Sequence, residues 1–470
     1  MRKTKIVCTI GPASNNEETL SRMCLAGMNV ARLNFSHGTH EEHKRNISLI
    51  KKVREKLGLP IAILLDTKGP EYRIGIFENK KIILNDGDLF TFTTDDIVGN
   101  TERVSVSYKG LTNDINPGDR ILLNNGLVVF DVIEVKGNDV ICKTVCGGEV
   151  SDRKSMSFPN KVLKQVYLSE QDKKDLLFGI ENGIDFIACS FVSCKQDLLD
   201  VKAFLNKHGV NDVELIAKIE NQAGIDNIEE ICSECSGIMI GRGDMGVEIA
   251  YEKLPAIQKH LITKCRMLGK RVITATEMLE SMIHNPRPTR AEISDVANAV
   301  YDGSSAVMLS GETAAGKYPV EAVGAMAKIA EETENNIHYE KRFSNNNFRI
   351  ENTLDAISHS TCCMAIDLNA SAIVVCSHSG MTARMVSRFR PPVDIIGLTT
   401  NEKASRKLAL SWGVTPVIAE AYPSTEVLFY IAKKKATEIF KLNSNDKIII
   451  TGGATNGSSG NTDLIKIETI

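Results

Sequence analysis

Short apolar segments rich in valine, isoleucine and leucine alternate along the chain with longer segments that have a helical pattern. Near-continuous apolar segments of this kind are typical of parallel strands that are buried on both faces. The pattern predicts eight such strands, at residues 4–10, 29–35, 60–67, 184–191, 213–220, 236–243, 271–276 and 304–310. Helical patterns follow most of them, for example at residues 41–57 and 319–334.

Eight strands, each followed by a helix, are the number that a (β/α)8 barrel requires. A doubly wound parallel sheet is the alternative that the same alternation allows. In barrel enzymes the chemistry lies where the strands end at their carboxyl side. We therefore expect functional residues directly after each predicted strand.

The alternation is interrupted between residues 74 and 158, where short strands are separated by turns. The predicted strands are residues 80–84, 88–93, 103–107, 120–123, 127–135 and 139–145. Turn sequences such as Asn85-Asp-Gly87, Pro117-Gly118 and Asn125-Gly126 lie between them. This pattern predicts a small all-β domain, inserted after the third barrel strand, that caps the mouth of the barrel.

A polar segment, residues 335–352, predicts a linker, after which a new α/β pattern begins. Its strands are expected at residues 372–377, 394–399, 415–419, 447–451 and 464–469. They indicate a separate α/β domain of about 120 residues, an ordinary domain size. The predicted organisation is a barrel domain (1–70 and 159–338), a β-lid (71–158) and a C-terminal α/β domain (339–470).

Composition changes this picture little but narrows the class of protein. The 470 residues carry 56 Lys and Arg against 59 Asp and Glu, so no nucleic-acid partner is indicated. No apolar run approaches the ~20 residues of a membrane span, and the basic N-terminus lacks the apolar region of a signal peptide. The 12 cysteines are scattered, as in a reduced protein. We expect a cytoplasmic protein without a membrane partner.

Three short motifs suggest other functions, but their context does not support them. Gly241–Gly246 fits G-x-G-x-x-G, yet residues 263–266 lack the acid that a dinucleotide site needs ~20 residues on. Gly311–Lys317 fits a P-loop, but Tyr318 stands where Ser or Thr would ligate magnesium. Cys232 and Cys235 form a lone C-x-x-C, which is better explained by packing than by a metal.

Charged residues gather at the expected mouth of the barrel. Lys218 and Glu220 are two residues apart on one strand and therefore share a face. Asp244 follows the next strand, about one inter-strand spacing (~5 Å) away. Two carboxylates from neighbouring strands form an oxygen site for Mg²⁺ or Mn²⁺. A structural ring of salt bridges at the mouth is the alternative.

Cations near this site indicate the class of substrate. Arg32, Arg73 and Lys218 beside one divalent ion are suited to a phosphate or carboxylate substrate. The amides of Gly243 and Asp244 open a helix and can hold an anion. Enzymes that transfer phosphoryl groups commonly use a metal ion together with lysine and arginine side chains.

The segments that carry these residues resemble the pyruvate kinase family over nearly the full chain length. They include Met28–Gly38, Leu65–Glu71, Lys218–Asn221, Ala275-Thr276, Pro286–Glu292 and Met308–Thr313. The resemblance implies a barrel, a β-lid and a C-terminal regulatory α/β domain, usually in a homotetramer. It also implies a glycolytic transferase that moves a phosphoryl group from phosphoenolpyruvate to ADP, giving pyruvate and ATP.

The resemblance implies roles for the residues at the mouth. Glu220 and Asp244 would bind Mg²⁺ (or Mn²⁺), and Lys218 would stabilise the phosphoryl group in flight. The Gly243 and Asp244 amides would hold the substrate carboxylate together with Thr276, which would also lie beside the proton that reaches C3 of the enolate. The implied catalytic residues are Lys218, Arg32, Thr276 and Arg73.

The resemblance also implies nucleotide and potassium sites. The nucleotide would contact Arg32, Asn34, His37 and Arg73, although His37 is more readily explained as a local structural residue than as a base. The residues that match the K⁺ site are Asn34, Ser36, Asp66 and Thr67. Glu71 stands where potassium-dependent members of the family have Glu and independent members have Lys, so dependence on K⁺ is implied.

This chain departs from the family pattern beside the nucleotide. Asn124 and Asn125 replace two aspartates of the lid, and Gln171 replaces a lysine expected near the nucleotide phosphates. The loss of two carboxylates and one ammonium changes the charge that meets ADP and its metal. Gly241 and Glu277 also replace the alanine and glutamine of the family pattern.

A loop of the C-terminal domain is a candidate effector site. Hydroxyls and amides at the strand-to-helix turn of residues 377–382 suit a phosphate, and the family's sugar-phosphate site uses the corresponding loop. The candidate residues are Ser377, Ser379, Gly380 and Thr382, although the loop lacks a lysine and a plain helix cap is the alternative. The glycine-rich segment 452–460 could complete such a site.

Three hypotheses follow for the function. The first is an active pyruvate kinase. The second is a diverged paralogue with weak turnover that acts as a ligand-binding regulatory protein. The third is a Mg²⁺-dependent lyase acting on pyruvate-type acids, since a barrel that holds an oxo-acid on Mg²⁺ can also cleave carbon bonds.

Overall fold

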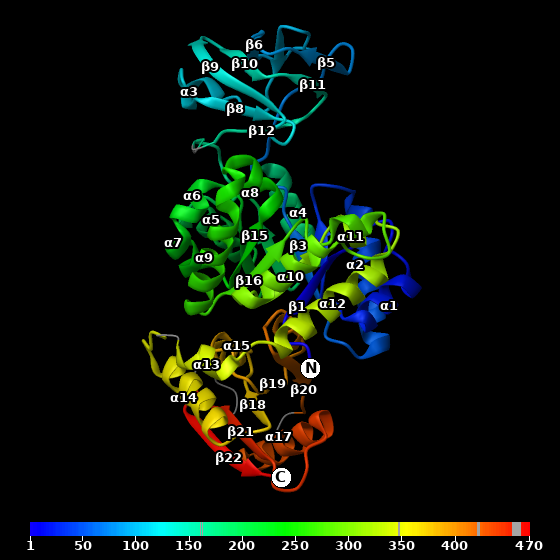
Figure 1. Cartoon of the computed structure of the whole chain (residues 1–470), viewed down its shortest axis with the longest axis vertical. Helices are drawn as coiled ribbons and strands as arrows, with labels where there is room; N and C mark the ends of the chain where they lie inside the picture. Colours follow the sequence, from blue (N-terminus) through cyan, green and yellow to red (C-terminus); the bar gives the residue numbers. More distant parts are fainter. Residues whose placement is uncertain (160, 162, 346–347, 421–423, 454–461) are drawn as a thin grey trace.

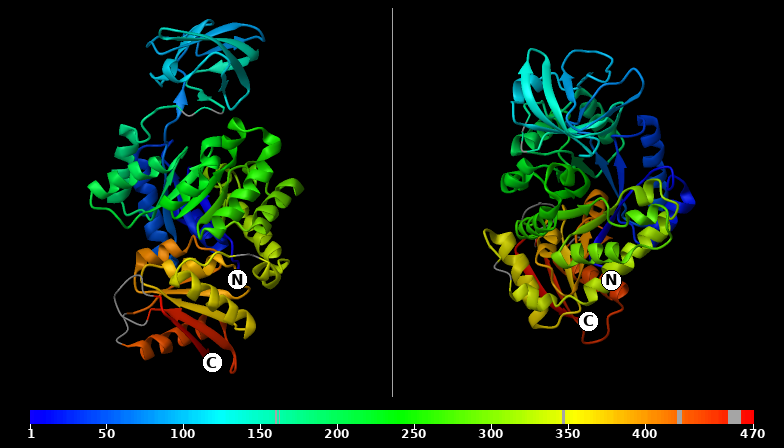
Figure 2. Two further views of the ribbon diagram at one scale, coloured as in Figure 1. Left: turned by 90° about the vertical axis from the view of Figure 1, so that its left-hand side faces the viewer. Right: turned by 45° about the horizontal axis from the view of Figure 1, so that its top comes forward.

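The computed structural model describes residues 1–159, 161, 163–345, 348–420, 424–453 and 462–470. Three parts follow one another along the long axis of the molecule (Figure 1). The β-lid lies at one end, the barrel in the middle and the C-terminal α/β domain at the other end. Figure 2 shows the same order from two further directions, with the lid joined to the barrel by narrow connections.

Within the described residues, eight parallel strands close into a barrel in the order β1-β17-β16-β15-β14-β13-β3-β2. The strands are β1 (Lys5–Thr9), β2 (Val30–Asn34), β3 (Ala62–Asp66), β13 (Phe186–Cys189), β14 (Glu214–Ile219), β15 (Gly237–Gly241), β16 (Arg271–Ala275) and β17 (Ala306–Leu309). Each lies inside one of the predicted segments. The predicted fold class, a (β/α)8 barrel with an inserted β-lid and a C-terminal α/β domain, is confirmed, and the doubly wound alternative is wrong.

Helices surround the barrel and connect its strands (Figure 1). They are α1 (Glu17–Ala26), α2 (His40–Leu57), α4 (Glu170–Glu181), α5 (Lys195–Lys207), α6 (Gln222–Asp226), α7 (Ile228–Glu234), α8 (Arg242–Glu248), α9 (Leu254–Met267), α10 (Arg290–Asp302), α11 (Gly311–Ala314) and α12 (Pro319–Asn335). Over the described part of the chain, we find no helix with the length and apolar content that crossing a membrane requires.

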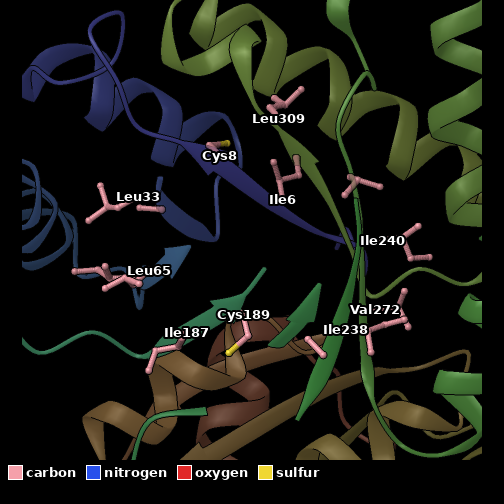
Figure 3. Packing of buried hydrophobic residues seen from close by; sticks show 14 of the residues in the cluster. Ile6, Cys8, Leu33, Leu65, Ile187, Cys189, Ile238, Ile240, Val272 and Leu309 are labelled. Atoms are coloured by element: carbon pink, nitrogen blue, oxygen red, sulfur yellow. The ribbon is translucent and has the colours of Figure 1, made fainter. Parts of the chain in front are cut away.

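Alternate residues of the barrel strands face two different cores. Side chains such as Ile6, Leu33 and Ile187 point outward and pack against the helices (Figure 3). Their neighbours fill the interior, and these include Val7, Val30, Leu64, Phe186, Ile216, Ile273 and Met308. Leu410, from the C-terminal domain, joins this interior cluster and is fully buried. The C-terminal domain therefore closes the base of the barrel and leaves the other end, the mouth, to the lid.

The lid is a β-structure with its own aromatic core. A seven-stranded sheet has the order β4-β12-β8-β9-β10-β6-β7, and β5 pairs with β11. The strands are β4 (Tyr72–Arg73), β5 (Lys81–Leu84), β6 (Leu89–Thr93), β7 (Arg103–Ser105), β8 (Arg120–Leu123), β9 (Val128–Lys136), β10 (Asp139–Cys146), β11 (Gly148–Ser151) and β12 (Ser155–Ser157), with the short helix α3 (Leu111–Asp114). Phe90, Phe92 and Phe130 are buried in edge-to-face and tilted contacts. Strands β4 and β12 are the paired connections to the barrel.

The C-terminal domain has a five-stranded sheet in the order β20-β19-β18-β21-β22. Its elements are α14 (Thr353–Asp367), β18 (Ala372–Cys376), α15 (Met381–Arg388), β19 (Asp394–Thr399), α16 (Glu402–Leu408), β20 (Val414–Ile418), α17 (Thr425–Phe440), β21 (Lys447–Gly452) and β22 (Leu464–Thr469). The prediction of a plain linker at 335–352 is wrong in part, because α13 (Tyr339–Ser344) lies within it. Burial of Tyr339 against Trp412 explains this helix in a polar segment.

Candidate active site

The ammonium group of Lys218 lies at the centre of a buried cluster at the barrel mouth. Ile216 faces the barrel interior, so Lys218, two residues later on β14, shares that face. Its Nζ donates a hydrogen bond to Ser190 Oγ (2.7 Å) and lies 3.1 Å from both Asp66 Oδ1 and Glu220 Oε1. Burial alone would lower the pKa of Lys218, but the two carboxylates outweigh burial and raise that pKa. The group is therefore a fixed cation at neutral pH.

Asp66 joins this cation to a second one, Arg32. Arg32 Nε lies 2.6 Å from Asp66 Oδ2, and Arg32 Nη1 donates to Thr9 Oγ1 at 2.8 Å. Asp66 is fully buried, which by itself would raise its pKa, but Arg32 and Lys218 reverse this effect and lower it. One carboxylate thus holds both cations in place before any ligand is bound.

The negative charge of the buried Glu220 carboxylate is less fully compensated by neighbouring cations than that of Asp66. Burial and the neighbouring Asp244 raise the pKa of Glu220 to about 7, against the opposing effects of Lys218 and the Phe191 N–H, which donates to Glu220 Oε2 at 2.8 Å. Gly241 leaves room for this side chain, since a Cβ built there would lie 2.6 Å from Glu220 Oε1. The departure from alanine at position 241 therefore leaves the space that the observed Glu220 conformation occupies.

The donor set fits a hard divalent cation. Asp244 lies exposed in the first turn of α8, and its charge acts on both Glu220 and Lys218. Over the described part of the chain no group of three or more His, Cys, Asp or Glu side chains is arranged to hold a metal. Two carboxylates suffice for Mg²⁺, which usually keeps waters and substrate oxygens as its other ligands.

Thr276 occupies a strained position directly after β16. Its φ is +69° and that of Glu277 is +53°, a left-handed conformation that is costly for a β-branched residue. Arg242 fixes this turn, because its Nη2 donates to the carbonyl oxygens of Thr276 (2.6 Å) and Glu277 (2.9 Å). Asp295 holds Arg242 at 2.7 Å. The turn brings Thr276 Oγ1 to 2.8 Å from the Gly243 amide, which donates to it.

A cavity of about 440 Å³ lies between the lid connections and the barrel mouth. Asp244 and Asn221 line it from the barrel, and Arg73, Asn124 and Asn125 line it from the lid side. The cavity is large enough for a small-molecule substrate.

Two family models match most of the chain. The family model described as "Pyruvate kinase, barrel domain" matches residues 1–323, and "Pyruvate kinase, alpha/beta domain" matches residues 355–468.

The chain belongs to the pyruvate kinase family.

Curated relatives named pyruvate kinase match it over its whole length. The relative from Clostridium acetobutylicum is 46% identical over 472 residues and is itself covered completely. One from Staphylococcus epidermidis is 47% identical, and the chain spans 81% of it. The crystal structure of a pyruvate kinase from Cryptosporidium parvum has a TM-score of 0.94 at 38% identity, covering 100% of this chain and 96% of that one. The predictions of the family, of pyruvate kinase function and of a phosphotransferase are confirmed, and the lyase hypothesis finds no support.

Arg73 does not join the buried cluster of this pyruvate kinase family member. It lies on β4, where its Nη2 is 2.5 Å from Glu71 Oε1 and its Nη1 donates to the Arg153 carbonyl oxygen (2.7 Å). Both contacts belong to the connection between barrel and lid. Arg73 is therefore held by the connection to the lid, whereas Arg32 is held within the barrel.

The residues predicted for the family's potassium site lie around the ends of β2 and β3. Asn34 pairs with Asp66 in register, and Asn34 Oδ1 accepts from the Ser36 amide at 3.1 Å. Thr67 Oγ1 accepts from the Ser190 amide at 3.1 Å. Ser36 is exposed, whereas Asp66 and Thr67 are buried, and the Asp66 carboxylate is engaged by the two cations. The residues lie close together, and their role in binding K⁺ stays a prediction.

A second cleft lies beside the predicted nucleotide residues. It has a volume of about 310 Å³, and Gln171 and Lys174 line it from α4. His40 lines it too, with its Nε2 at 2.6 Å from Asp175 Oδ1. His37 is exposed, and its carbonyl oxygen contacts His43 Nε2 at 2.9 Å. Lys174 thus places an ammonium group one helical turn from Gln171.

The candidate effector loop is a strand-to-helix turn in the C-terminal domain. Ser377 Oγ accepts from the Gly380 amide at 3.1 Å, and Ser379 Oγ contacts the Met381 amide at 3.4 Å. Gly380 has φ +80° at the start of α15, a conformation that suits glycine. Thr382 is buried, with its Oγ1 at 2.7 Å from Thr462 Oγ1. Residues 454–460 of the predicted glycine-rich segment lie outside the described residues.

Sequence reasoning missed three residues of the site. Ser190 lies just beyond β13, and no sequence pattern indicates that it contacts Lys218. Arg242 fixes the strained turn through contacts 34 and 35 residues away in the chain, which no local pattern reveals. Lys174 could have been found, because residues three apart on a helix share a face.

Proposed function

We propose that this chain transfers the phosphoryl group of phosphoenolpyruvate to ADP, giving pyruvate and ATP in glycolysis. Family membership supports this reaction. The observation that carries it at the level of chemistry is the Lys218 ammonium, held 3.1 Å from both Asp66 and Glu220 beside the exposed Asp244. Phosphoryl transfer is favoured by a fixed cation, here Lys218, next to two carboxylates that can hold a metal ion, here Glu220 and Asp244.

Lys218 and Arg32 act on the charge of the transferring group. Negative charge spreads over the equatorial oxygens of the phosphoryl group in the transition state. Lys218 is positioned before the reaction by Ser190 and the two carboxylates, and Arg32 by Asp66 and Thr9. Because these groups need not reorganise, they stabilise the transition state more than the ground state.

Glu220 and Asp244 would hold Mg²⁺ (or Mn²⁺). When bound, the metal neutralises charge on the substrate oxygens as a Lewis acid. Burial, with a contribution from Asp244, raises the pKa of Glu220 to about 7, and this supports the assignment, since a divalent cation would stabilise the ionised carboxylate. The residues proposed for K⁺ are Asn34, Ser36, Asp66 and Thr67, with dependence on K⁺ following from Glu71.

Thr276 and Gly243 would orient the substrate carboxylate. The Gly243 amide donates to Thr276 Oγ1 at 2.8 Å, so the two groups lie next to each other at the mouth. In this arrangement the Thr276 hydroxyl would lie beside the proton that reaches C3 of the enolate. Arg242 would act as a positioning residue through the Thr276 carbonyl oxygen.

The nucleotide would bind on the other side of the site. Arg32, Asn34, His37 and Arg73 are its proposed contacts, with Arg73 brought in by movement of the lid. Lys174 would supply the ammonium that Gln171 lacks, because both line the same cleft. We also propose a cytoplasmic homotetramer whose 377–382 loop binds a sugar-phosphate effector.

The test is an assay of the purified full chain with phosphoenolpyruvate, Mg²⁺ and K⁺, with and without ADP. Pyruvate and ATP formed in equal amounts, and only with ADP, would support the proposal. Tight binding of phosphoenolpyruvate with negligible turnover would favour the diverged regulatory paralogue. Cleavage of a pyruvate-type acid without ADP would favour the lyase.

A further inference from the structure

A small polar cavity lies where the base of the barrel meets the C-terminal domain. Its volume is about 10 Å³. Six of its lining residues are cations: Arg266, Lys270, Arg271, Arg384, Arg388 and Arg390. Ser305, Ser387 and Ser411 add hydroxyl groups. None of the described residues that line it carries a carboxylate, so the cavity combines positive charge with hydrogen-bond donors.

Among these six cations, Arg390 is deeply buried, and the hydrogen bonds that it makes within the described residues all go to neutral oxygens. Its side chain is 4% exposed, and its Nη2 donates to the Gly303 carbonyl oxygen and to Ser305 Oγ, each at 3.0 Å. Its Nη1 donates to the Ser387 carbonyl oxygen at 3.2 Å. Arg390 Nε is buried and has no hydrogen-bond partner among the described residues. A buried guanidinium without an anionic partner is costly.

The surrounding cations share few acids. Arg388 Nη1 lies 3.1 Å from Asp355 Oδ1. Glu214 is paired with Arg271 and lies 3.8 Å from both Arg384 and Lys407. Lys270 Nζ donates to the Cys235 carbonyl oxygen at 2.9 Å.

Two further buried donors and the pKa of Arg390 also indicate that the cavity carries excess positive charge. The Nε atoms of Arg384 and Arg388 are also buried and lack a hydrogen-bond partner within the described part of the chain. Burial and the nearby Arg266 hold the pKa of Arg390 well below its usual value. The positive charge of this cluster therefore exceeds the negative charge that the neighbouring carboxylates supply.

The size of the cavity restricts the anion that would balance this charge. A volume of about 10–15 Å³ admits one species of the size of a water molecule. A tetrahedral oxoanion is much larger than this volume, whereas a chloride ion is a single atom only somewhat larger than a water molecule. We propose that the cavity binds a chloride ion, which balances the arginine cluster and stabilises the contact between the barrel and the C-terminal domain. This inference does not depend on the proposed catalytic function.

Anomalous diffraction from crystals of the full chain soaked in sodium bromide tests the location. We expect a bromide peak in the cavity, within hydrogen-bonding distance of Arg390 and Lys270. Bromide found only on the protein surface would overturn the proposal.

Thermal unfolding tests binding in solution. At equal ionic strength, the Tm should rise with sodium chloride in place of sodium gluconate and then saturate, because the anion binds the folded state. Lys270→Met keeps the aliphatic stem and should weaken the apparent chloride affinity about tenfold, the loss expected for one charge-assisted contact. Arg406→Met is the matched control, since Arg406 bonds Asp185 (2.9 Å) at the same base of the barrel but outside the cavity.

Three outcomes would contradict the proposal. One is the same Tm of the unaltered chain in chloride and gluconate. Another is an equal chloride dependence in Lys270→Met and in the unaltered chain. Sulfate stabilises proteins generally, so it counts only if Lys270→Met abolishes its effect, which would show an oxoanion site instead.

Discussion

The two ends of the barrel hold opposite charge imbalances. At the mouth, Asp66 contacts both Lys218 and Arg32, Glu220 contacts Lys218, and Asp244 adds a third negative charge that acts on Lys218. Around the small cavity at the base, the two carboxylates Glu214 and Asp355 lie beside four cations, Arg271, Arg384, Arg388 and Lys407. These opposite imbalances are the basis for the metal site proposed at the mouth and the anion site proposed at the base.

Glu214 at the base and Glu220 at the mouth show how neighbouring charges produce this difference. Burial acts to raise the pKa of both. At the base, Arg271, Arg384 and Lys407 outweigh burial and lower the pKa of Glu214 to about 2. At the mouth, Asp244 adds to burial and raises the pKa of Glu220 to about 7. The comparison shows that burial alone does not predict the charge state of a carboxyl group in this protein.

Removing the Lys218 ammonium group at the mouth should have the largest effect on turnover. Lys218→Met should lower kcat by about 10³-fold or more, because a preorganised group that stabilises transition-state charge is lost. Measurement of kcat together with Mn²⁺ binding would separate catalysis from metal affinity, which should be retained. Lys202→Met is the control, since Lys202 pairs with Glu234 on the surface of α5 (2.7 Å). Wild-type turnover in Lys218→Met would remove this residue from the mechanism.

Removing the charge of Glu214, which several cations share at the base of the barrel, should affect stability rather than catalysis. Glu214→Gln should cost about 3–5 kcal/mol near neutral pH, as expected when a buried ion pair loses one partner. The midpoint of urea unfolding measures this change. Glu229→Gln is the control, because Glu229 is exposed and pairs with a single lysine, Lys264.

The same variant has a defined pH dependence. The folded pKa of Glu214 is about 2, below its ordinary value of 4.5. Its contribution to stability is thus fully present above the ordinary pKa and is lost as pH falls toward 2. The difference between Glu214→Gln and the unaltered chain should shrink over this window. A difference that stays constant down to low pH would contradict the assigned pairing.

Adding a permanent cation at the mouth should relax the need for a monovalent ion. Glu71→Lys should reduce the activation by K⁺ about tenfold, equivalent to ~1.4 kcal/mol. The ratio of kcat with and without K⁺ at constant ionic strength measures this effect. Glu71→Gln is the matched control, since it removes the contact with Arg73 without adding a charge. An unchanged K⁺ response in Glu71→Lys would count against the proposed potassium site.

The smallest effect is expected on the nucleotide side, where the charges are exposed. Lys174→Met should raise the KM for ADP about fivefold and leave the KM for phosphoenolpyruvate unchanged, because one solvent-exposed contact is worth little. Lys173→Met is the control on the same helix, where Lys173 pairs with Glu170 (2.7 Å). Equal KM values for ADP in both variants would exclude Lys174 from the nucleotide site.

The sequence predicted the barrel well because its strands are buried on both faces and read as continuous apolar segments. Once those strands were placed, barrel topology brought Lys218, Glu220 and Asp244 to one mouth. The short lid strands β11 and β12 were not predicted, because Gly148–Ser151 and Ser155–Ser157 are largely polar. Pairing with β5 and β8, rather than local pattern, holds them in the sheet.

The rest of the site depends on contacts that no local pattern contains. The position of Arg73 follows from the connection to the lid, where Glu71 and Arg153 hold it. The charge cluster of the base joins Arg271, at the start of a barrel strand, with Arg390 of the C-terminal domain. Each looks like an ordinary cation in the sequence, and only the docking of two domains brings them together.

The proposed metal site at the mouth can be tested by a crystal structure of the full chain with Mn²⁺ and oxalate, which mimics the enolate of pyruvate. We expect an anomalous peak for one ion bound by Glu220 and Asp244, with oxalate between that ion and Lys218. An ion bound elsewhere, or bound without either carboxylate, would contradict the proposed active site.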